Sequence, residues 1–392
     1  MSALGGANQE ALKNQIAKRS KLRVWLDFSE RRGVAPPRAL IAMSGGVDSS
    51  MTAYLMQQAG YDCVGVHMQL QADPSPDAAA ARDIAARLNM PFHEYDLSQR
   101  FHEQVVQPFV KGYESGETPN PCIVCNRYLK FGALLKIADE LGCDYLATGH
   151  YGRIEYDEGL GRWVARTAAD SSKDQSYVLY TLSQEQLSRV VLPLGTYHKS
   201  EIREMAAQAG FPNANKSDSQ DICFVPDNDY AKFIENYRGK PCKEGDMLDT
   251  EGTIVGKHRG LIHYTIGQRK GLGAHGRPVF VQSINAEQNT ITIGDDESIL
   301  RRQSFLVRDF NWLALASTPQ KPLSCNIKIG YKHPQRLGTI QAATVDGTEY
   351  IKVTFDEPQR AITPGQSAVF YNGHTKTEGN TVLGGGTIDR VL

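Results

Sequence analysis

The sequence lacks an apolar run long enough to span a membrane, a signal-peptide pattern, an internal repeat and any low-complexity segment. It also lacks an excess of charge of either sign, because 43 lysines and arginines face 44 acidic residues, for a formal net charge of −1. Overall charge therefore gives no indication of a nucleic-acid partner, and any such evidence has to be local. These absences predict a soluble globular protein without a membrane partner. A chain of 392 residues is long enough for two or three domains.

Cysteine is scarce, and its number is odd. Four of the seven cysteines lie outside any recognisable motif, which does not suit a disulfide framework. The pattern is typical of a reducing cytosol, where thiols stay available for chemistry. We therefore expect a cytoplasmic protein with a few working thiols.

What the sequence does contain is a glycine-rich loop between a short apolar run and a helix. The residues Ala39–Ala42 predict a buried parallel strand, 44–46 a tight loop, and 49–58 a helix that ends at Gly60. Free backbone N–H groups and the helix dipole favour an anion at such a helix start, and glycine lets a phosphate approach closely. Asp48 suits Mg²⁺, which prefers carboxylate and phosphate oxygens. No Gly-Lys-Ser/Thr follows, so the loop is not a Walker A motif. It resembles the loop of the ATP pyrophosphatases, and an ordinary glycine-rich turn is the less favoured alternative.

Strand-like and helical runs alternate from residue 39 to 226, which predicts an α/β domain with a doubly wound parallel sheet. The second strand would bring Met68 to the carboxyl edge of the sheet, beside the nucleotide, although a methionine there can equally belong to the core. A strand over 144–148 would do the same for Gly149 and His150. A lone histidine at a strand end is about as often structural as functional.

A Pro-Asn-Pro-Cys-x-x-Cys segment precedes a helix expected from about Tyr128 to Leu141. Its prolines keep the chain extended, so Cys122 and Cys125 should lie at a helix start, where the dipole favours thiolate. Such a pair can be a redox dithiol, half of a zinc site or two iron–sulfur ligands, and the residues alone leave these open. Cys223 follows a polar turn within an apolar triplet, so a buried structural thiol is the alternative to a working one there.

The remaining segments differ in charge and patterning. Residues 1–38 form an extension with a net charge of +5, which predicts a solvated helix in preference to a basic RNA-binding arm. Residues 227–300 indicate a small linking domain, whose stretch from 252 to 286 has no acidic residue. Its cations, Arg269 and Lys270 among them, suit contacts with a phosphate backbone. From residue 301 to 392, alternating Val, Ile and Thr with frequent turns predicts a small antiparallel β-barrel.

Taken together, the motifs resemble the bacterial and organellar tRNA-specific 2-thiouridylases, from Ala39 to the end of the chain. Six motifs occur in one order: Ser-Gly-Gly-Val-Asp-Ser-Ser, Thr-Pro-Asn-Pro-x-x-x-Cys-Asn, Ala-Thr-Gly-His-Tyr, Lys-Asp-Gln-Ser-Tyr, Ser-x-Asp-Ile-Cys-Phe and Tyr-Thr-Ile-Gly-Gln-Arg-Lys-Gly-Leu-Gly. The resemblance implies an adenine nucleotide α-hydrolase-like sheet, a central linking domain and a C-terminal barrel. It also implies ATP- and Mg²⁺-dependent 2-thiolation of the wobble uridine of tRNA. The implied partners are tRNA and a sulfur donor, either a cysteine desulfurase or a relay protein.

The resemblance assigns roles to individual residues. It makes Cys125 the nucleophile and Cys223 the persulfide-bearing cysteine. The implied ATP site consists of Ala42, Met43, Ser44, Gly45, Gly46, Val47, Asp48, Ser49, Met68 and Gly149. Asn120, Pro121 and Cys122 would flank the target base. The implied tRNA contacts are His150, Lys173, Asp174, Gln175, Gly330, Tyr331 and Gln366.

Two positions depart from the family pattern. Gly330 stands where an arginine is expected beside Tyr331, and Cys122 stands where many members carry aspartate. With Cys122, three cysteines could hold a [4Fe–4S] cluster with one open iron, whereas a persulfide route needs only Cys125 and Cys223. We slightly favour the cluster. An amidotransferase-type synthetase is a further alternative, but no glutaminase-like segment is visible. A non-enzymatic RNA-binding protein would be expected to have lost the loop aspartate or the cysteines.

Overall fold

The computed structural model describes residues 35–71, 76–217, 222–373 and 380–392. The basic extension predicted for residues 1–38 lies almost entirely outside the described residues, as does most of the polar turn before Cys223. The chain divides into two compact units. Among the described residues, the first contains 35–71, 76–104, 123–217 and 380–382, and the second contains 105–122, 222–373 and 383–392. The domain boundaries expected from the sequence stay a prediction.

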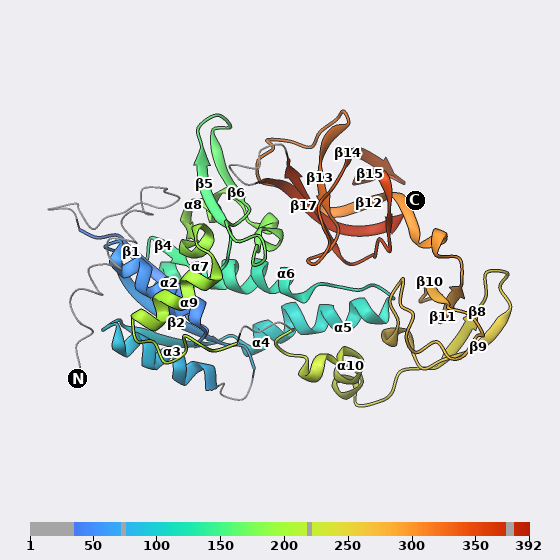
Figure 1. Cartoon of the computed structure of the whole chain (residues 1–392), viewed down its shortest axis with the longest axis horizontal. Helices are drawn as coiled ribbons and strands as arrows, with labels where there is room; N and C mark the ends of the chain where they lie inside the picture. The colour runs from blue at the N-terminus through green and yellow to red at the C-terminus, as the bar shows by residue number, and fades with distance from the viewer. Residues whose placement is uncertain (1–34, 72–75, 218–221, 374–379) are drawn as a thin grey trace. The chain divides into compact units, whose positions relative to one another are not determined.

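The first unit is built on a parallel sheet with the strand order β3-β2-β1-β4-β7. Its strands are β1 (Arg38–Ala42), β2 (Asp62–Gln69), β3 (Phe92–Asp96), β4 (Tyr145–Ala147) and β7 (Val190–Val191) (Figure 1). Strand β1 pairs in parallel with β2 on one side and with β4 on the other. The chain thus builds outward from β1 in one direction and then returns to its other side. This confirms the doubly wound sheet and makes the carboxyl end of β1 the switch point at which such sheets bind ligands.

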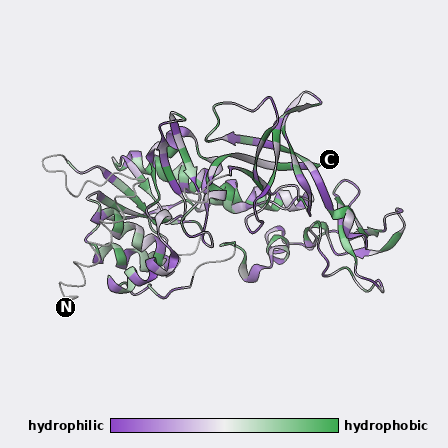
Figure 2. Cartoon of the chain, turned by 45° about the horizontal axis from the view of Figure 1, so that its top comes forward, coloured by the Kyte–Doolittle hydropathy of each residue, from purple (hydrophilic) through white to green (hydrophobic). Residues whose placement is uncertain are grey.

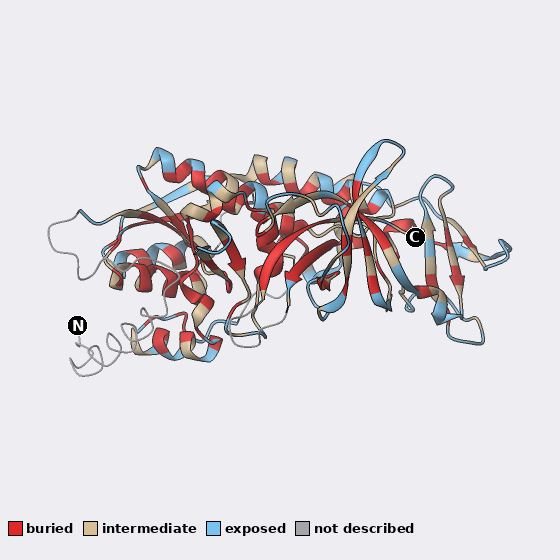
Figure 3. Ribbon diagram, turned by 90° about the horizontal axis from the view of Figure 1, so that it is seen from above, coloured by how far each residue is buried: buried red, intermediate tan, exposed pale blue. Residues whose placement is uncertain are grey.

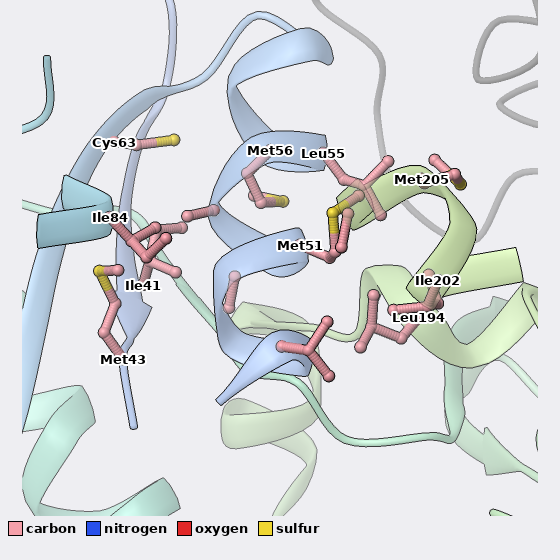
Figure 4. Packing of buried hydrophobic residues seen from close by; sticks show 14 of the residues in the cluster. Ile41, Met43, Met51, Leu55, Met56, Cys63, Ile84, Leu194, Ile202 and Met205 are labelled. Carbon is pink, nitrogen blue, oxygen red and sulfur yellow. The ribbon is translucent and has the colours of Figure 1, made fainter. Parts of the chain in front are cut away.

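Helices cover this sheet and bury its apolar strands. The helices of this unit are α2 (Val47–Gln58), α3 (Pro76–Arg87), α4 (Ser98–Phe101), α7 (Leu134–Glu140), α8 (Gln184–Arg189) and α9 (Lys199–Gln208), of which α2, α3 and α7 pack directly on strands of the sheet. Ile41 of β1 shares one buried cluster with Met51 and Leu55 of α2 and with Ile202 and Met205 of α9 (Figure 4). Burying each of these side chains contributes about 1.5–3 kcal/mol, so the cluster fixes α2 and α9 beside each other. Figure 3 shows buried residues both on strands and on helices of the chain.

The helix that carries the Cys-x-x-Cys pair begins earlier than predicted. It starts as α6 (Pro121–Cys125), continues as the π-helical stretch η2 (Asn126–Ala133) and ends as α7. The predicted start at Tyr128 is wrong because proline is well tolerated at the first helical position, where its missing N–H is not needed. The side chain of Asn120 also accepts a hydrogen bond from the N–H of Cys122 at 3.1 Å, which caps the helix. Both cysteines therefore lie within the first helical turns.

The first unit also has an antiparallel hairpin of β5 (Arg153–Asp157) and β6 (Arg162–Arg166), which the sequence analysis did not predict. Short helices complete the connections of the whole chain: η1 (His102–Val106), η3 (Ser176–Thr181), η4 (Pro193–Thr196), η5 (Pro226–Asn228), η6 (Leu261–His263) and η7 (Glu297–Leu300). Within the described ranges, no helix is both long and apolar enough to cross a membrane.

The second unit contains α5 (Gln107–Glu114), α10 (Tyr230–Arg238) and a small sheet in the order β10-β11-β8-β9. The strands of this sheet are β8 (Gly245–Leu248), β9 (Ile254–His258), β10 (Phe280–Asn285) and β11 (Thr290–Gly294). Met247, Val281 and Ile291 form its buried core together with Tyr264. The basic stretch predicted from the sequence is therefore carried on a folded element with its own apolar interior.

The end of the chain forms the antiparallel barrel that the sequence predicts. Its strands are β12 (Arg301–Trp312), β13 (Leu323–Lys328), β14 (Arg336–Val345), β15 (Thr348–Arg360), β16 (Ser367–Asn372) and β17 (Thr381–Val391). Strand β12 pairs with β15 on one side and with β17 on the other, which closes the sheet on itself. Hydrophobic and hydrophilic residues mix along these strands, as expected where one face of each strand turns inward (Figure 2).

Candidate functional site

The glycine-rich loop lies at the carboxyl end of β1, where the sheet topology places a ligand site. Gly45 has φ +73°, and a Cβ there would lie 2.4 Å from the backbone oxygen of Asp77, so no other residue fits without rearrangement. The Ser49 hydroxyl donates to the carbonyl of Gly46 at 2.9 Å and accepts from the N–H of Ser44 at 3.2 Å. These bonds hold the loop against the first turn of α2. The structure thus has the strand, loop and helix start that the sequence predicts.

Asp48, in the first turn of α2, has charged and polar partners within its own unit. The Nζ of Lys199 lies 2.7 Å from both carboxylate oxygens of Asp48. The hydroxyl of Tyr151 donates to Asp48 Oδ1 at 2.8 Å. The Lys199 side chain is 9% exposed and that of Asp48 is 31% exposed. The carboxylate assigned to Mg²⁺ is therefore accessible but held by an ammonium group.

Gly149, which follows the end of β4, lies next to Asp48. A Cβ at this position would lie 3.0 Å from Asp48 Cβ and 3.1 Å from the backbone nitrogen of Ser49. The carboxyl end of β4 and the start of α2 are thus in close contact, which glycine permits. Met68 lies near the carboxyl end of β2, half-buried and in register with Tyr95 of β3. The loop, Asp48 and Gly149 come together as the sequence led us to expect.

Sequence reasoning missed three residues that contact the loop. Lys199 pairs with Asp48, and the buried His67 ring bonds the carbonyl of Met43 through Nδ1 at 2.8 Å. The side-chain amide of Asn213 donates to the carbonyl of Gly45 at 3.1 Å and to the hydroxyl of Ser50 at 2.9 Å. Lys199 could have been suspected from its place in a polar cluster that opens an amphipathic helix. For the histidine and the asparagine, nothing in the local sequence indicates the contact.

His150 and the Lys-Asp-Gln cluster were assigned to tRNA, and the structure gives several of these side chains internal partners. His150 is buried, and its Nδ1 lies 2.7 Å from the hydroxyl of Thr148. Burial, and to a lesser degree the charge of Lys130, hold the pKa of His150 well below its usual value. Asp174 accepts the Ser176 hydroxyl at 2.8 Å, and Gln175 Oε1 accepts the N–H of Tyr151 at 2.9 Å. Lys173 remains half-exposed.

The seven cysteines fall into distinct environments. Cys122 and Cys223 are exposed, and Cys125 is 7% exposed. The alternative of a buried structural thiol at Cys223 is therefore wrong: the neighbouring Phe224 is the buried residue, packed edge-on against Phe109 with ring centroids 5.3 Å apart.

Three of the four cysteines outside the motifs are buried, and the fourth, Cys242, is partly exposed. Burial raises the pKa of Cys63 and of Cys325 to about 12 and also raises the pKa of Cys143, so these three groups stay protonated thiols. Across the described residues, no three His, Cys, Asp or Glu side chains gather in a way that could hold a metal ion.

In the second unit, the C-terminal barrel holds the segment that leads to the first cysteine. Gln366 Nε2 donates to the carbonyl of Thr118 at 2.6 Å, and the N–H of Thr118 donates to the carbonyl of Pro364 at 3.0 Å. Arg308 of β12 binds both carboxylate oxygens of Glu117, at 3.1 and 3.3 Å. Gln366, assigned to tRNA from the sequence, thus has a structural contact beside Asn120 and Pro121.

The other residues assigned to tRNA lie on the second unit as well. Arg269 and Lys270 are both exposed. Tyr331 is 43% exposed, with the ammonium of Lys328 5.5 Å from its ring centroid, whereas the neighbouring Gly330 is buried. Not every cation of the basic stretch is equally available, because Lys257 forms an ion pair with Asp246 and Arg277 forms one with Asp295.

Comparison with known protein families identifies the domains of this chain. Residues 37–227 match the family model described as the tRNA methyl transferase HUP domain. Residues 231–295 match the tRNA methyl transferase PRC-barrel domain, and residues 302–388 match the aminomethyltransferase beta-barrel domain. The sheet and its glycine-rich loop thus form a HUP domain, and the chain belongs to the three-domain class that these models describe.

Relatives identify the family within that class. The chain is 43% identical over 367 residues to a tRNA-specific 2-thiouridylase MnmA from Clostridioides difficile, covering 91% of this chain and 99% of the relative. It is 44% identical over 365 residues to the protein of the same name from Moorella thermoacetica, covering 90% and 99%. A solved NMN synthetase from Francisella tularensis is 16% identical, with a TM-score of 0.34 over 60% of this chain and 87% of that one.

The chain belongs to the family of the tRNA-specific 2-thiouridylases. The family expected from the sequence motifs is thereby confirmed, as is the enzyme class that defines it, tRNA-uridine 2-sulfurtransferase. An amidotransferase-type synthetase and a non-enzymatic RNA-binding protein are set aside in favour of this class.

Proposed function

We propose that this protein adenylates the C2 oxygen of the wobble uridine of tRNA with ATP and then replaces that oxygen with sulfur through Cys125 and Cys223. The structural feature that supports this proposal most directly lies within the first unit. A serine–glycine loop with Asp48 at a helix start lies at the sheet's switch point, and the same unit contains Cys125 in the first turns of a helix. The proposal places the reaction in the cytoplasm, with tRNA as the substrate.

The first chemical step concerns the poor reactivity of the uracil C2 carbonyl. Its oxygen attacks the α-phosphorus of ATP, the bond to the β-phosphate oxygen breaks, and pyrophosphate leaves. The backbone N–H groups around Gly45 and Gly46 and the start of α2 would bind the phosphates. Asp48 would hold Mg²⁺, since this ion commonly binds through one or two carboxylates together with substrate phosphates. When bound, Mg²⁺ neutralises phosphate charge.

In the second step sulfur displaces the adenylate. The terminal sulfur of a Cys223 persulfide attacks C2, the C2–O bond breaks, and AMP leaves. The thiolate of Cys125 then attacks the Cys223 sulfur, cleaves the S–S bond and releases 2-thiouridine. The transferred sulfur gains two electrons, and the two cysteines lose them as they form a disulfide, which an external dithiol reductant must reduce before the next turnover. The persulfide is supplied by a cysteine desulfurase or a relay protein.

Cys122 is the residue that this route leaves without a chemical role. A [4Fe–4S] cluster would use it as a third thiolate, together with Cys125 and Cys223. The persulfide route needs no such cluster, and within each unit the described residues include no three-ligand group suited to a metal ion. The exposure of Cys122 and its place beside the capping residue Asn120 suit a position next to the target base.

Reconstitution with wobble-uridine tRNA, ATP, Mg²⁺ and a desulfurase system tests the proposal. Nucleoside mass spectrometry should show 2-thiouridine, with one pyrophosphate and one AMP released for each sulfur transferred. A tRNA with cytidine at the wobble position is the matched substrate control and should give neither product. Formation of ADP, or thiolation without AMP release, would contradict the adenylation step.

A second experiment separates the two sulfur routes. The wild type and Cys122→Ser are purified anaerobically, and their iron content, absorption spectra and thiolation rates are compared. The persulfide route predicts no stoichiometric iron and thiolation by Cys122→Ser within about threefold of wild type. Four irons per chain in the wild type, lost together with activity in Cys122→Ser, would establish the cluster route instead.

A further inference from the structure

Lys199 is a buried cation directed at the glycine-rich loop, and nothing above assigns it a role. It is the first residue of α9, and its side chain is 9% exposed. Its Nζ lies 2.7 Å from Asp48 Oδ1 and 2.7 Å from Asp48 Oδ2. Lysine is rarely buried, and when it is, it has a charged partner that compensates for lost hydration. Here that partner is the one carboxylate of the loop.

Several contacts keep the Lys199 ammonium at this point. Its backbone N–H donates to Asp170 Oδ2 at 3.0 Å, which fixes the start of α9. The Nζ also lies 5.7 Å from the ring centroid of Tyr151, the residue whose hydroxyl bonds Asp48. Helix α9 is anchored on α2 through the buried cluster around Met51 and Ile202 (Figure 4). The backbone of α9 cannot move away from α2 without disturbing that core. A change in the contacts of Lys199 therefore has to come from its side chain.

The ion pair has a consequence for a divalent cation. Mg²⁺ binds carboxylate oxygens at about 2.0–2.1 Å, and the ammonium contacts both oxygens of Asp48, with the Tyr151 hydroxyl donating to Oδ1 as well. Mg²⁺ on the remaining lone pair of Oδ2 would lie beside the ammonium, so repulsion between the two positive charges displaces Lys199 from the oxygen that Mg²⁺ takes. A displaced ammonium in a largely buried position requires a new anionic partner nearby. The nucleotide that arrives with Mg²⁺ supplies one in its phosphate chain.

We propose that Lys199 occupies Asp48 before the nucleotide binds and then moves to the β- and γ-phosphates of ATP, which makes it a phosphate-binding residue. This inference rests on the use of ATP proposed above. No covalent bond changes in the exchange: the ammonium leaves a carboxylate for a phosphate, and Mg²⁺ takes its place on Asp48. In the reaction, Lys199 then stabilises charge on the departing pyrophosphate. AMP lacks both outer phosphates, so Lys199 contributes to binding of ATP and pyrophosphate and not to binding of AMP.

Calorimetric titration of the full chain without tRNA tests this selectivity. The ligands are MgATP, magnesium pyrophosphate and AMP, and the variants are Lys199→Met, which keeps the length of the side chain, and Lys199→Arg, which keeps its charge. Lys136→Met removes an exposed lysine of α7 in the same unit and is the matched control. We expect Lys199→Met to weaken MgATP and pyrophosphate about 10- to 100-fold and to leave AMP within twofold. Lys199→Arg should lose less, and Lys136→Met should match wild type.

Retained AMP binding also shows that the variant's pocket is folded. Equal losses for ATP and AMP in both Lys199 variants would indicate a structural role and overturn the inference, as would unchanged ATP binding by Lys199→Met. A wild type that binds no MgATP would overturn the proposed function together with the inference. A titration with Mn²⁺ alone tests the displacement: Lys199→Met should bind it about tenfold more tightly than wild type, and equal binding would contradict the exchange at Asp48.

Discussion

Replacement of Asp48 by asparagine should affect both catalysis and local stability, and the structure gives the size of the second effect. The substitution removes the countercharge of an ammonium that is only 9% exposed. Breaking a fully buried pair costs about 3–5 kcal/mol, and the 31% exposure of Asp48 reduces this to about 2 kcal/mol. An energy of about 2 kcal/mol corresponds to about a 30-fold change in the equilibrium for local opening.

Hydrogen exchange followed by mass spectrometry measures the equilibrium for local opening of α2 by itself. Amides of α2 in Asp48→Asn should exchange about 30-fold faster than in wild type. The control is Asp83→Asn, which breaks an exposed pair with Arg87 on α3 and should change exchange by about twofold at most. Because the double variant Asp48→Asn, Lys199→Met has neither charge, its α2 exchange should return to within about fivefold of wild type.

Pyrophosphate release should be lost in both variants that lack Asp48, because Mg²⁺ then has no carboxylate. Slow α2 exchange in Asp48→Asn would refute the energetic argument for the ion pair. Wild-type pyrophosphate release by either variant would refute the role given to Asp48. A double variant as unstable as Asp48→Asn would show that the lost stability comes from another contact, such as the hydroxyl of Tyr151.

Three further outcomes are expected. Cys125→Ser should release pyrophosphate in the presence of tRNA but form no 2-thiouridine, since adenylation precedes sulfur transfer; loss of both activities would place Cys125 in the first step. The pKa of His150 is lowered in the folded chain, so the stability it confers is present above its ordinary value of 6.5 and is lost as the pH falls below it. Wild-type stability should therefore fall toward pH 5 by up to about 1.4 kcal/mol per pH unit more than that of His150→Gln, and parallel urea titrations would contradict this. Neutralising Arg269 and Lys270 should reduce the slope of log Kd for tRNA against log salt by about 0.7–0.9 per lost phosphate contact, and an unchanged slope would move the tRNA surface elsewhere.

Local sequence determined the strand, loop and helix of the proposed nucleotide site. The apolar run Ala39–Ala42, the glycines after it and the helical pattern that follows act over a few neighbouring residues, so their structure can be predicted from sequence alone. The barrel was predictable for the same reason, since alternating β-branched residues and turns specify strands one hairpin at a time. The order of the motifs also indicated the family, which the comparisons confirm.

The start of the helix that carries the cysteines was harder to predict, because the one or two residues at the boundary determine where the helix begins. Pro121 was interpreted as a residue that keeps the chain extended, whereas proline at a first helical position starts a helix equally well. The capping bond from Asn120 decides between the two, and its geometry depends on where the chain before it lies. Gln366 and Arg308, more than 180 residues further along, hold that preceding segment at Thr118 and Glu117.

Only the tertiary structure decided which side chains complete the site. Lys199 lies 151 residues from Asp48 and Asn213 lies 168 residues from Gly45, and no periodic pattern links such positions. They meet because α9 and the turn after it pack on α2 through a common apolar core, and a core constrains volume without specifying which polar group is brought to its edge. The sequence by itself therefore determined the glycine-rich loop, and the packing of distant elements determined which cation opposes its carboxylate.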